Sequence, residues 1–231
     1  MTWKTSFRSI YYDGAPEPDD LALAPNETAL LVIDVQNTYL ARPDRAVLSP
    51  EEQRLYDAWT PFHTRMREIV IPNTARLLSL FRRHGIECLF ARIACLTRDG
   101  RDRSLSQKKP GWNNLLLPRD EHTSQLVREL APVGDEIVVT KTTDSALTGT
   151  NLRLVLNNLG VKNVVCAGIF TDQCVSSTVR SLADESYNVV VVEDCCAAGS
   201  DELHRKELEI INMIYCHVVS SGELAAMMGL K

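Results

Sequence analysis

The sequence contains no apolar run approaching the roughly 20 residues that are needed to span a bilayer. Residues 1–20 have no apolar stretch behind their positive charges, so we do not expect a signal peptide. No dense cluster of Lys and Arg is present, and the net charge is −5, whereas a phosphate backbone requires a basic footprint. We therefore expect neither a membrane nor a nucleic acid as a partner.

The sequence also lacks a CxxC pair, and its seven cysteines show no even ladder of spacings. Several lie inside apolar stretches such as CLFARI and NVVCAGI, where a free thiol packs as a small hydrophobic group. This pattern is typical of reduced thiols and predicts a cytoplasmic protein without a disulfide framework. The five histidines are scattered without ligand spacing, so we expect no metal site and no other cofactor.

The composition of the 231 residues, 45% hydrophobic and 24% charged, is ordinary for a globular protein and excludes intrinsic disorder. Residues 1–28 are polar and contain three prolines, which predicts an N-terminal arm before a single domain over residues 29–231. Within this domain, compact apolar runs alternate with segments of helical periodicity. The expected strands are 29–35, 86–93, 136–141, 163–169, 188–194 and 216–221. The expected helices are 64–83, 121–130, 150–160, 171–186 and 201–214, with a short terminal helix after them.

Strands that alternate with helices predict an α/β fold in which right-handed crossovers build a mostly parallel sheet. The strand segments are continuously apolar, which indicates that helices cover both faces of the sheet. We therefore expect a three-layer α/β/α domain with about six strands. In such sheets, ligands bind beyond the carboxyl ends of the strands.

Three reactive side chains fall at that edge of the predicted sheet. Asp34 closes the first strand, Lys141 closes the third, and Cys174 lies in the first turn of the helix after the fourth. A helix N-terminus and a nearby lysine favour thiolate, and a carboxylate can take the thiol proton as a general base. Together with an oxyanion hole at the same turn, these groups are the parts needed for acyl transfer from an amide. Taken singly, each also fits a structural role as a turn cap, a solvated lysine or a packing cysteine.

Three segments in order resemble the motifs of the isochorismatase-like cysteine hydrolases: ALLVIDVQNTY, TKTTDSALTGTNL and GIFTDQCVSSTVRSLADESYNVVVVEDCCAA. The resemblance covers roughly residues 28–221. It implies a three-layer fold and a catalytic triad of Asp34, Lys141 and Cys174. It also implies a cis peptide between Ile169 and Phe170, made possible by close backbone approach at Gly168. The N–H groups of Phe170 and Cys174 would then form the oxyanion hole.

The region after the second strand narrows the resemblance to one branch of the family. Nicotinamidases of this family bind a metal there through an Asp-x-His pair and a further histidine, but ARIACLTRDGRDRSLSQ contains no histidine. Isochorismate-cleaving members often lack the thiol that Cys174 provides. The chain therefore resembles the metal-free amidohydrolases of ureido and carbamoyl compounds, such as biuret, ureidoacrylate or N-carbamoylsarcosine, or of small amides such as maleamate.

We accordingly predict hydrolysis of a small linear amide or ureido C–N bond through a thioester acyl-enzyme, with release of ammonia or an amine. One alternative is the hydrolysis of an isochorismate-like vinyl ether, with Asp34 as the acid and Cys174 incidental. Another is a non-catalytic binding module on the same fold. Apolar stretches near 64–81 and in the terminal helix predict a homo-oligomer, a dimer or a tetramer.

Further pocket residues are predicted with alternatives left open. Tyr39 matches the family aromatic that walls the pocket, or is a core tyrosine. Gln36 would orient Asp34 or contact the substrate, and Ile169 would contact the substrate beside the nucleophile. Trp112 would line the pocket or pack at a subunit contact. The basic residues after the second strand form a solvated face, or one of them binds a substrate carboxylate: Arg98, Arg101, Arg103, Lys108 and Lys109.

Overall fold

The computed structural model describes residues 4–231, and a six-stranded parallel sheet lies at the centre of the fold. The strand order is β5-β2-β1-β6-β7-β8, so β1 and β6 lie in the middle of the sheet. The strands are β1 Thr28–Ile33, β2 Glu87–Ile93, β5 Ile137–Lys141, β6 Asn163–Ile169, β7 Asn188–Ala197 and β8 His217–Val219. These bounds confirm all six predicted strands to within a few residues.

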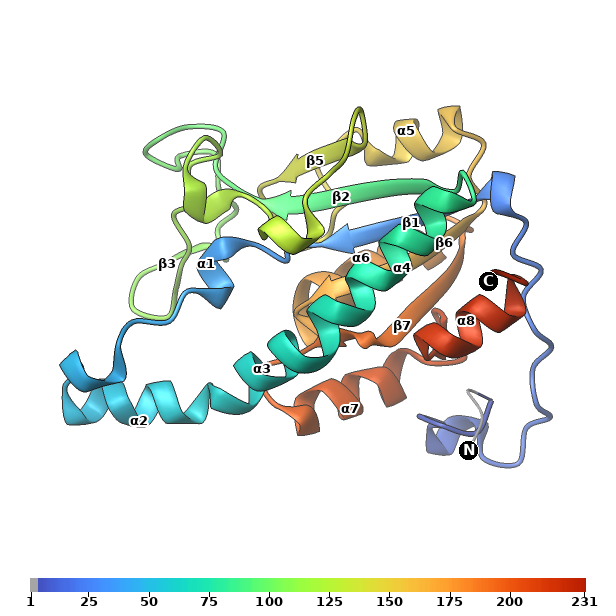
Figure 1. Ribbon diagram of the computed structural model, residues 1–231, viewed down its shortest axis with the longest axis horizontal. Helices are drawn as coiled ribbons and strands as arrows, with labels where there is room; N and C mark the ends of the chain where they lie inside the picture. Colours follow the sequence, from blue (N-terminus) through green and yellow to red (C-terminus); the bar gives the residue numbers. More distant parts are fainter. Residues whose placement is uncertain (1–3) are drawn as a thin grey trace.

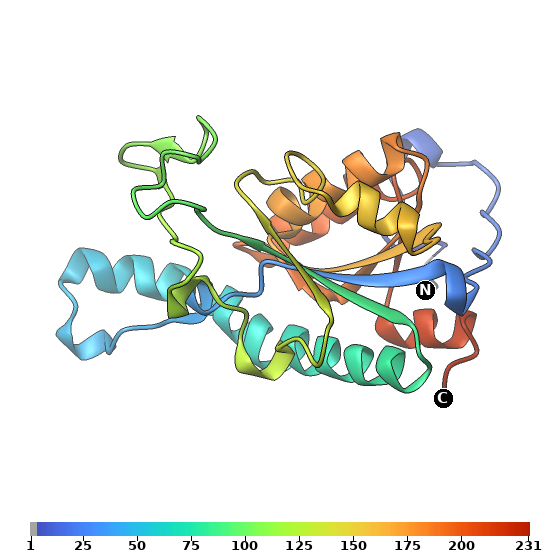
Figure 2. The ribbon, with the colours of Figure 1, turned by 90° about the horizontal axis from the view of Figure 1, so that it is seen from above.

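Helices cover both faces of the sheet, which confirms the three-layer α/β/α architecture (Figure 2). On one face lie α4 (Ile71–Arg83) and α8 (Ser221–Met227), and on the other lie α5 (Leu152–Asn158), α6 (Ser176–Asp184) and α7 (Asp201–Ile211). Each layer packs its apolar side chains against one face, so the core consists of two clusters separated by the sheet. Strands buried on both faces explain why β1 and β6 consist almost entirely of buried residues.

The longest helical segment is interrupted where proline occurs. Helix α3 (Thr60–Arg65) passes through a π-helical turn (η4, Met66–Val70) before α4 begins at Ile71. Pro72 is the second residue of α4 and directly follows the π-helical turn. The helix ends before Gly85, whose φ of 64° fits the predicted left-handed cap. The predicted helix 64–83 is thus confirmed, with the restart at its proline.

Two excursions leave the sheet on the side of its carboxyl ends (Figure 1). The segment after β1 forms α1 (Asn37–Leu40) and then α2 (Pro50–Ala58), which begins with a capping box between Ser49 and Glu52. The segment after β2 forms a small hairpin of β3 (Lys108–Lys109) and β4 (Asn113–Asn114). Both excursions therefore start from the edge where the ligand site was expected.

The predicted helix 121–130 is wrong. This segment forms two short 3₁₀ turns, His122–Ser124 and Arg128–Leu130. Between them, Leu126 pairs with Gln36 in an isolated antiparallel bridge, and the Val127 N–H donates to the carbonyl of Val35. These long-range backbone hydrogen bonds take the place of the helical ones that local periodicity suggested.

The N-terminal segment, residues 4–27, contains only the 3₁₀ turns Ile10–Tyr12 and Pro25–Glu27. The side-chain amide of Asn212, just after α7, donates to the carbonyls of Ser6 and Phe7 and holds the beginning of this segment. Within residues 4–231, no helix has the length and apolar character that crossing a membrane requires.

Candidate active site

Asp34 directly follows the last residue of β1, at the carboxyl edge of the sheet. Its φ of 54° turns the backbone away from the strand direction, while its N–H still donates to the carbonyl of Ala91 on β2 at 2.9 Å. A short acidic side chain tolerates this left-handed conformation better than most residues. The turn directs the carboxylate inward, where the residue is only 1% exposed.

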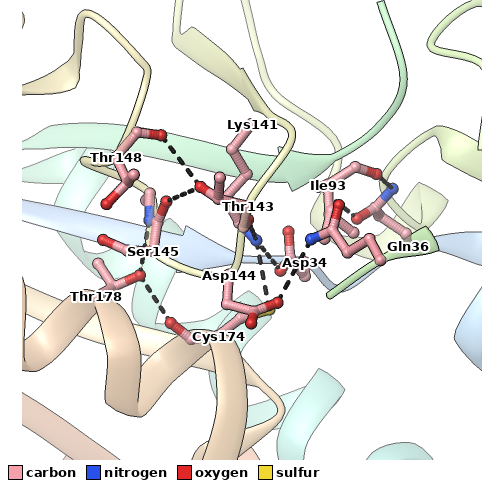
Figure 3. Close-up of polar contacts among 12 residues, drawn as sticks. Asp34, Gln36, Ile93, Lys141, Thr143, Asp144, Ser145, Thr148, Cys174 and Thr178 are labelled. Carbon is pink, nitrogen blue, oxygen red and sulfur yellow. Dashed lines mark hydrogen bonds and ion pairs between the residues drawn. The ribbon is translucent and has the colours of Figure 1, made fainter. Parts of the chain in front are cut away.

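Lys141 is the last residue of β5, and its side chain is completely buried. Its Nζ atom lies 2.6 Å from Oδ2 of Asp34 and donates to Sγ of Cys174 at 3.3 Å and to the carbonyl of Thr143 at 3.1 Å. An ammonium group has three donors, so these partners use all of them. Lys141 therefore joins the carboxylate to the sulfur, as Figure 3 shows.

Cys174 lies in a π-helical turn (η7, Thr171–Val175) that continues directly into α6. The turn follows β6, so the thiol reaches the same edge of the sheet as Asp34 and Lys141. The Cys174 carbonyl accepts a hydrogen bond from Oγ1 of Thr178 at 2.7 Å, which anchors the turn to α6. The structure thus brings together the three side chains that the motifs predicted.

Burial and charge pull in opposite directions on the Asp34–Lys141 pair. Burial raises the pKa of Asp34 above its ordinary value, although the positive charge of Lys141 and hydrogen bonds from Cys174 and Lys141 oppose the shift. Burial also disfavours the charged form of Lys141, but the negative charges beside it outweigh this effect and raise the pKa of Lys141. Lys141 therefore favours its charged form beside Asp34, and its charge limits the rise in the pKa of that carboxyl group.

The influences that favour thiolate at Cys174 do not prevail over burial in the folded protein. Burial and the neighbouring charge of Asp34 raise the pKa of Cys174 well above the ordinary thiol value, and Lys141 only partly offsets them. The helix N-terminus, the lysine and the carboxylate are visible in the sequence, whereas desolvation depends on the folded surroundings. The free protein consequently holds the proton on sulfur, next to a carboxylate that can accept it.

The backbone before the nucleophile is as tightly constrained as the side chains. The Ile169–Phe170 peptide is cis, as the resemblance implied. A Cβ atom built on Gly168 would lie 2.0 Å from the carbonyl oxygen of Ile33, so only glycine permits β6 to lie this close to β1 at its end. The Phe170 ring packs against Tyr39, Trp59 and Phe62, with ring centroids 5.1–5.9 Å apart. This aromatic cluster ties the turn to the segments that follow β1.

A network of hydrogen bonds between side chains also holds the π-helical turn that contains Cys174. Nη2 of Arg65 on α3 lies 2.9 Å from Nε2 of His204, and Nδ1 of the same ring lies 2.7 Å from Oγ1 of Thr171. Since a guanidinium group can only donate, Nε2 is the acceptor, and Nδ1 carries the proton that is donated to Thr171. Arg65 also donates to the carbonyls of Glu193 and Cys196 on β7. The sequence offered no signal for this network, because its members lie far apart along the chain.

A cavity of about 690 Å³ opens over the triad. Tyr39 and Ile169, two of the predicted substrate contacts, line it together with Phe170, and the largely exposed Trp112 on the β3–β4 hairpin also lines it. The complete lining is Asp34, Tyr39, Ile93, Gln107, Trp112, Asn113, Leu115, Asp144, Ile169, Phe170, Asp172, Gln173, Cys174, Ser176, Ser177 and Arg180. None of the five basic residues from the loop after β2 lines this cavity.

Gln36 is not brought into the cavity. Its amide nitrogen donates to the carbonyls of Ile93 and Ser124, and its amide oxygen accepts from the N–H of Ile93, each at 2.9 Å. The side chain is fully buried and clamps the end of β1 to the end of β2. Its position beside Asp34 therefore serves the scaffold, and the amide has no donor left for a substrate.

Asp144 is a cavity residue that sequence reasoning missed. It lies three residues after Lys141, and its Oδ1 is 4.0 Å from Sγ of Cys174. The available signal was its place inside the second motif, directly before Ser145 and Ala146. Among residues 4–231, no three His, Cys, Asp or Glu side chains cluster closely enough to hold a metal ion.

The comparisons with known proteins agree with this fold. The family model described as the isochorismatase domain matches residues 28–223, so the chain belongs to the isochorismatase family. The ureidoacrylate amidohydrolase RutB of Acinetobacter baylyi is 28% identical over 212 residues, covering 86% of this chain and 82% of that protein. RutB of Serratia proteamaculans is 30% identical over 196 residues, covering 77% of this chain and 72% of the relative.

Solved structures show the same architecture. A cysteine hydrolase from Pseudomonas syringae pv. phaseolicola superposes with a TM-score of 0.74 at 20% identity, covering 90% of this chain and 95% of the other. The N-carbamoylsarcosine amidase of Thermoplasma acidophilum superposes with a TM-score of 0.63 at 21% identity, covering 84% and 96%. At these identities the similarity establishes the fold.

Proposed function

We propose that this protein is a cysteine-dependent amidohydrolase that cleaves the C–N bond of a small linear amide or ureido compound. The observation that carries the proposal is the position of Lys141 Nζ, 2.6 Å from Asp34 and 3.3 Å from the sulfur of Cys174, at the base of a cavity. A nucleophile, a base and a fixed cation within reach of one another are the requirements of covalent acyl transfer. The relatives named ureidoacrylate amidohydrolase support the same class of reaction.

In the first half of the reaction, the Asp34 carboxylate takes the proton from Cys174 as the sulfur attacks the carbonyl carbon. A C–S bond forms, and the carbonyl oxygen becomes an oxyanion, which the backbone N–H groups of Phe170 and Cys174 stabilise. The C–N bond then breaks, and Asp34 gives its proton to the departing nitrogen. Ammonia or an amine leaves, and the acyl group remains on sulfur as a thioester.

In the second half, Asp34 takes a proton from a water molecule that attacks the thioester. The C–S bond breaks, the acid is released, and the proton returns to sulfur. Lys141 keeps its charge throughout and compensates the negative charge that moves between Asp34 and Cys174. Tyr39 and Ile169 form walls of the cavity against which the substrate would lie.

The test is ammonia release from a panel containing ureidoacrylate, N-carbamoylsarcosine, biuret, maleamate and the amine-bearing 3-aminopropanamide. We expect at least one compound to be hydrolysed, and a thioester adduct on Cys174 to be detected by mass spectrometry after acid quench. Cys174→Ala should abolish both signals. The control is Cys88→Ala, which removes another buried thiol near the N-terminal end of β2, away from the carboxyl edge of the sheet. This variant should retain activity.

Turnover that survives both iodoacetamide treatment and Cys174→Ala would contradict the mechanism and support the vinyl-ether reaction with Asp34 as the acid. If folded protein releases no ammonia from any amide and never acquires an acyl group, the hydrolase proposal fails and a binding role replaces it.

A further inference from the structure

The charges that line the cavity do not balance. Asp34 is neutralised by Lys141 at 2.6 Å. Arg180 is the one Lys or Arg side chain that residues 4–231 contribute to the lining, and it forms an ion pair with Glu207 at 2.8 Å. Its guanidinium carbon also lies 5.1 Å from the ring centroid of Tyr215.

Two lining carboxyl groups remain, those of Asp144 and Asp172, and among residues 4–231 neither has an ion-pair partner. Oδ1 of Asp172 is buried without a hydrogen-bond partner, and burial raises the pKa of this carboxyl group. Asp172 is thus partly buried, whereas Asp144 is an exposed residue of the cavity lining.

Asp144 is also positioned by the fold close to the sulfur of Cys174. Its Oδ1 lies 4.0 Å from Sγ of Cys174, and Nε2 of the buried Gln107 approaches the same oxygen at 3.5 Å. The next two residues fix the turn to α6, because Oγ of Ser145 donates to Ser181 at 2.9 Å and the Ala146 N–H donates to Thr178 at 3.0 Å (Figure 3). Asp144 thus directly precedes two residues that hydrogen bonds anchor to α6.

Among residues 4–231, no ion pair joins Asp144 to a basic side chain of the neighbouring loop. Arg103 donates its guanidinium N–H groups to the carbonyls of Gly100, Gln107 and Leu115 and to the side chain of Asn114. Nζ of Lys108, the direct neighbour of Gln107, donates to the carbonyl of Arg101. A substrate carboxylate placed next to the reacting carbonyl would therefore meet like charge, while an amino or ammonium group would meet an acceptor.

From this arrangement, and resting on the proposed hydrolysis at Cys174, we propose that Asp144 is a specificity residue. It accepts hydrogen bonds from an amino or ammonium group of the substrate and repels amides that carry a carboxylate near the scissile bond. The preferred substrate class is therefore an amine-bearing linear amide. The substrates in the names of the relatives, ureidoacrylate and N-carbamoylsarcosine, are carboxylates and would be disfavoured.

The first experiment measures the charge in front of Cys174 without any substrate. The protein is treated separately with methanethiosulfonates bearing a trimethylammonium or a sulfonate group, and the rate of modification of the Cys174 peptide is followed by mass spectrometry. The labelling ratio is the rate with the cationic reagent divided by the rate with the anionic reagent, corrected by the same quotient for a small free thiol. We expect this ratio to be about ten or more in the wild type. Asp144→Asn should bring the ratio close to one.

The matched control is Asp135→Asn, which removes an exposed carboxylate at the opposite end of β5 and should leave the ratio unchanged. A wild-type ratio near one, or a ratio that Asp144→Asn does not lower, overturns the role of Asp144.

The second experiment compares ammonia release from 3-aminopropanamide, butanamide and succinamate, which differ mainly in the charge at the far end. We expect kcat/KM to fall in that order in the wild type and the order to flatten or reverse in Asp144→Asn. Succinamate hydrolysed as fast as the ammonium compound overturns the inference and leaves the amidohydrolase proposal intact. Absence of acylation by every amide overturns the proposed function, and the labelling ratio still decides what Asp144 does.

Discussion

Nζ of Lys141 lies 2.6 Å from Oδ2 of Asp34, and neither side chain is more than 2% exposed. A buried ion pair is costly to break on one side only, because the remaining charge stays desolvated. We expect Lys141→Met to lower the free energy of unfolding by about 3–5 kcal/mol and to abolish activity. Urea denaturation followed by circular dichroism measures the first effect.

The double variant Asp34→Asn with Lys141→Met should recover much of the lost stability without recovering activity, because no buried charge is left unpaired. Lys162→Met, which removes the exposed ion pair with Glu27, should cost less than about 1 kcal/mol. A loss for Lys141→Met as small as that of Lys162→Met would contradict a tightly coupled buried pair.

The decrease of kcat/KM at low pH should follow the protonation of Asp34, whose pKa is raised. The carboxylate form is required to accept the thiol proton, so kcat/KM rises as the pH increases through this pKa. We expect the midpoint to lie above the ordinary carboxyl value of 3.8, and the pH dependence of Cys174 alkylation by iodoacetamide to show the same decrease at low pH. In Asp34→Asn this decrease should disappear from the alkylation profile. An alkylation profile of the wild type that matches that of the variant would rule out Asp34 as the base.

Gly168→Ala tests the close approach of β6 to β1. The added Cβ would meet the Ile33 carbonyl at 2.0 Å, and the φ of 121° is itself unfavourable for alanine. Since the obstacle is backbone in the middle of the sheet, we expect destabilisation of several kcal/mol, or failure to fold, by urea denaturation. Gly222→Ala in α8 meets no atom within 4 Å and should be neutral or stabilising by up to about 1 kcal/mol. Equal stability of the two variants would show that β1 and β6 can separate at this point.

His204 should make stability depend on pH in the range of histidine titration. Burial and the charge of Arg65 lower the pKa of His204, so the folded protein holds the ring neutral while the unfolded chain binds a proton below about pH 6.5. Because the unfolded state then binds more protons, this contribution is complete above pH 6.5 and decreases as the pH falls. We expect the stability difference between the wild type and His204→Gln to shrink between pH 7.5 and 5.5 in urea denaturation. A difference that stays constant over this interval would mean that the ring does not titrate differently in the two states.

The sequence allows the fold and the triad to be predicted for one physical reason. Continuous apolar runs identify strands that are buried on both faces, and parallel strands bring their carboxyl ends to one edge, so Asp34, Lys141 and Cys174 could be placed on the same edge of the sheet. The resemblance in three motifs then placed the cis peptide and the close approach at Gly168. Both are found in the structure.

What could not be predicted depends on contacts between distant segments. Residues 121–130 have helical periodicity, but backbone pairing with residues 35–37 takes their hydrogen bonds. Gln36 was expected near the substrate, and only the positions of Ile93 and Ser124 reveal that its amide is already used. The pKa of Cys174 follows from burial, which local spacing does not report.

The place of β5 in the strand order has a consequence for how the protein would fail. This strand pairs only with β2, yet it carries Lys141, the cation that holds the other two members of the triad. Outer strands open by local fluctuation more easily than inner ones, which are paired on both sides. Heat or denaturant should therefore abolish activity while most of the sheet is still folded. The stability of β5 against local opening then sets the conditions under which the protein remains active.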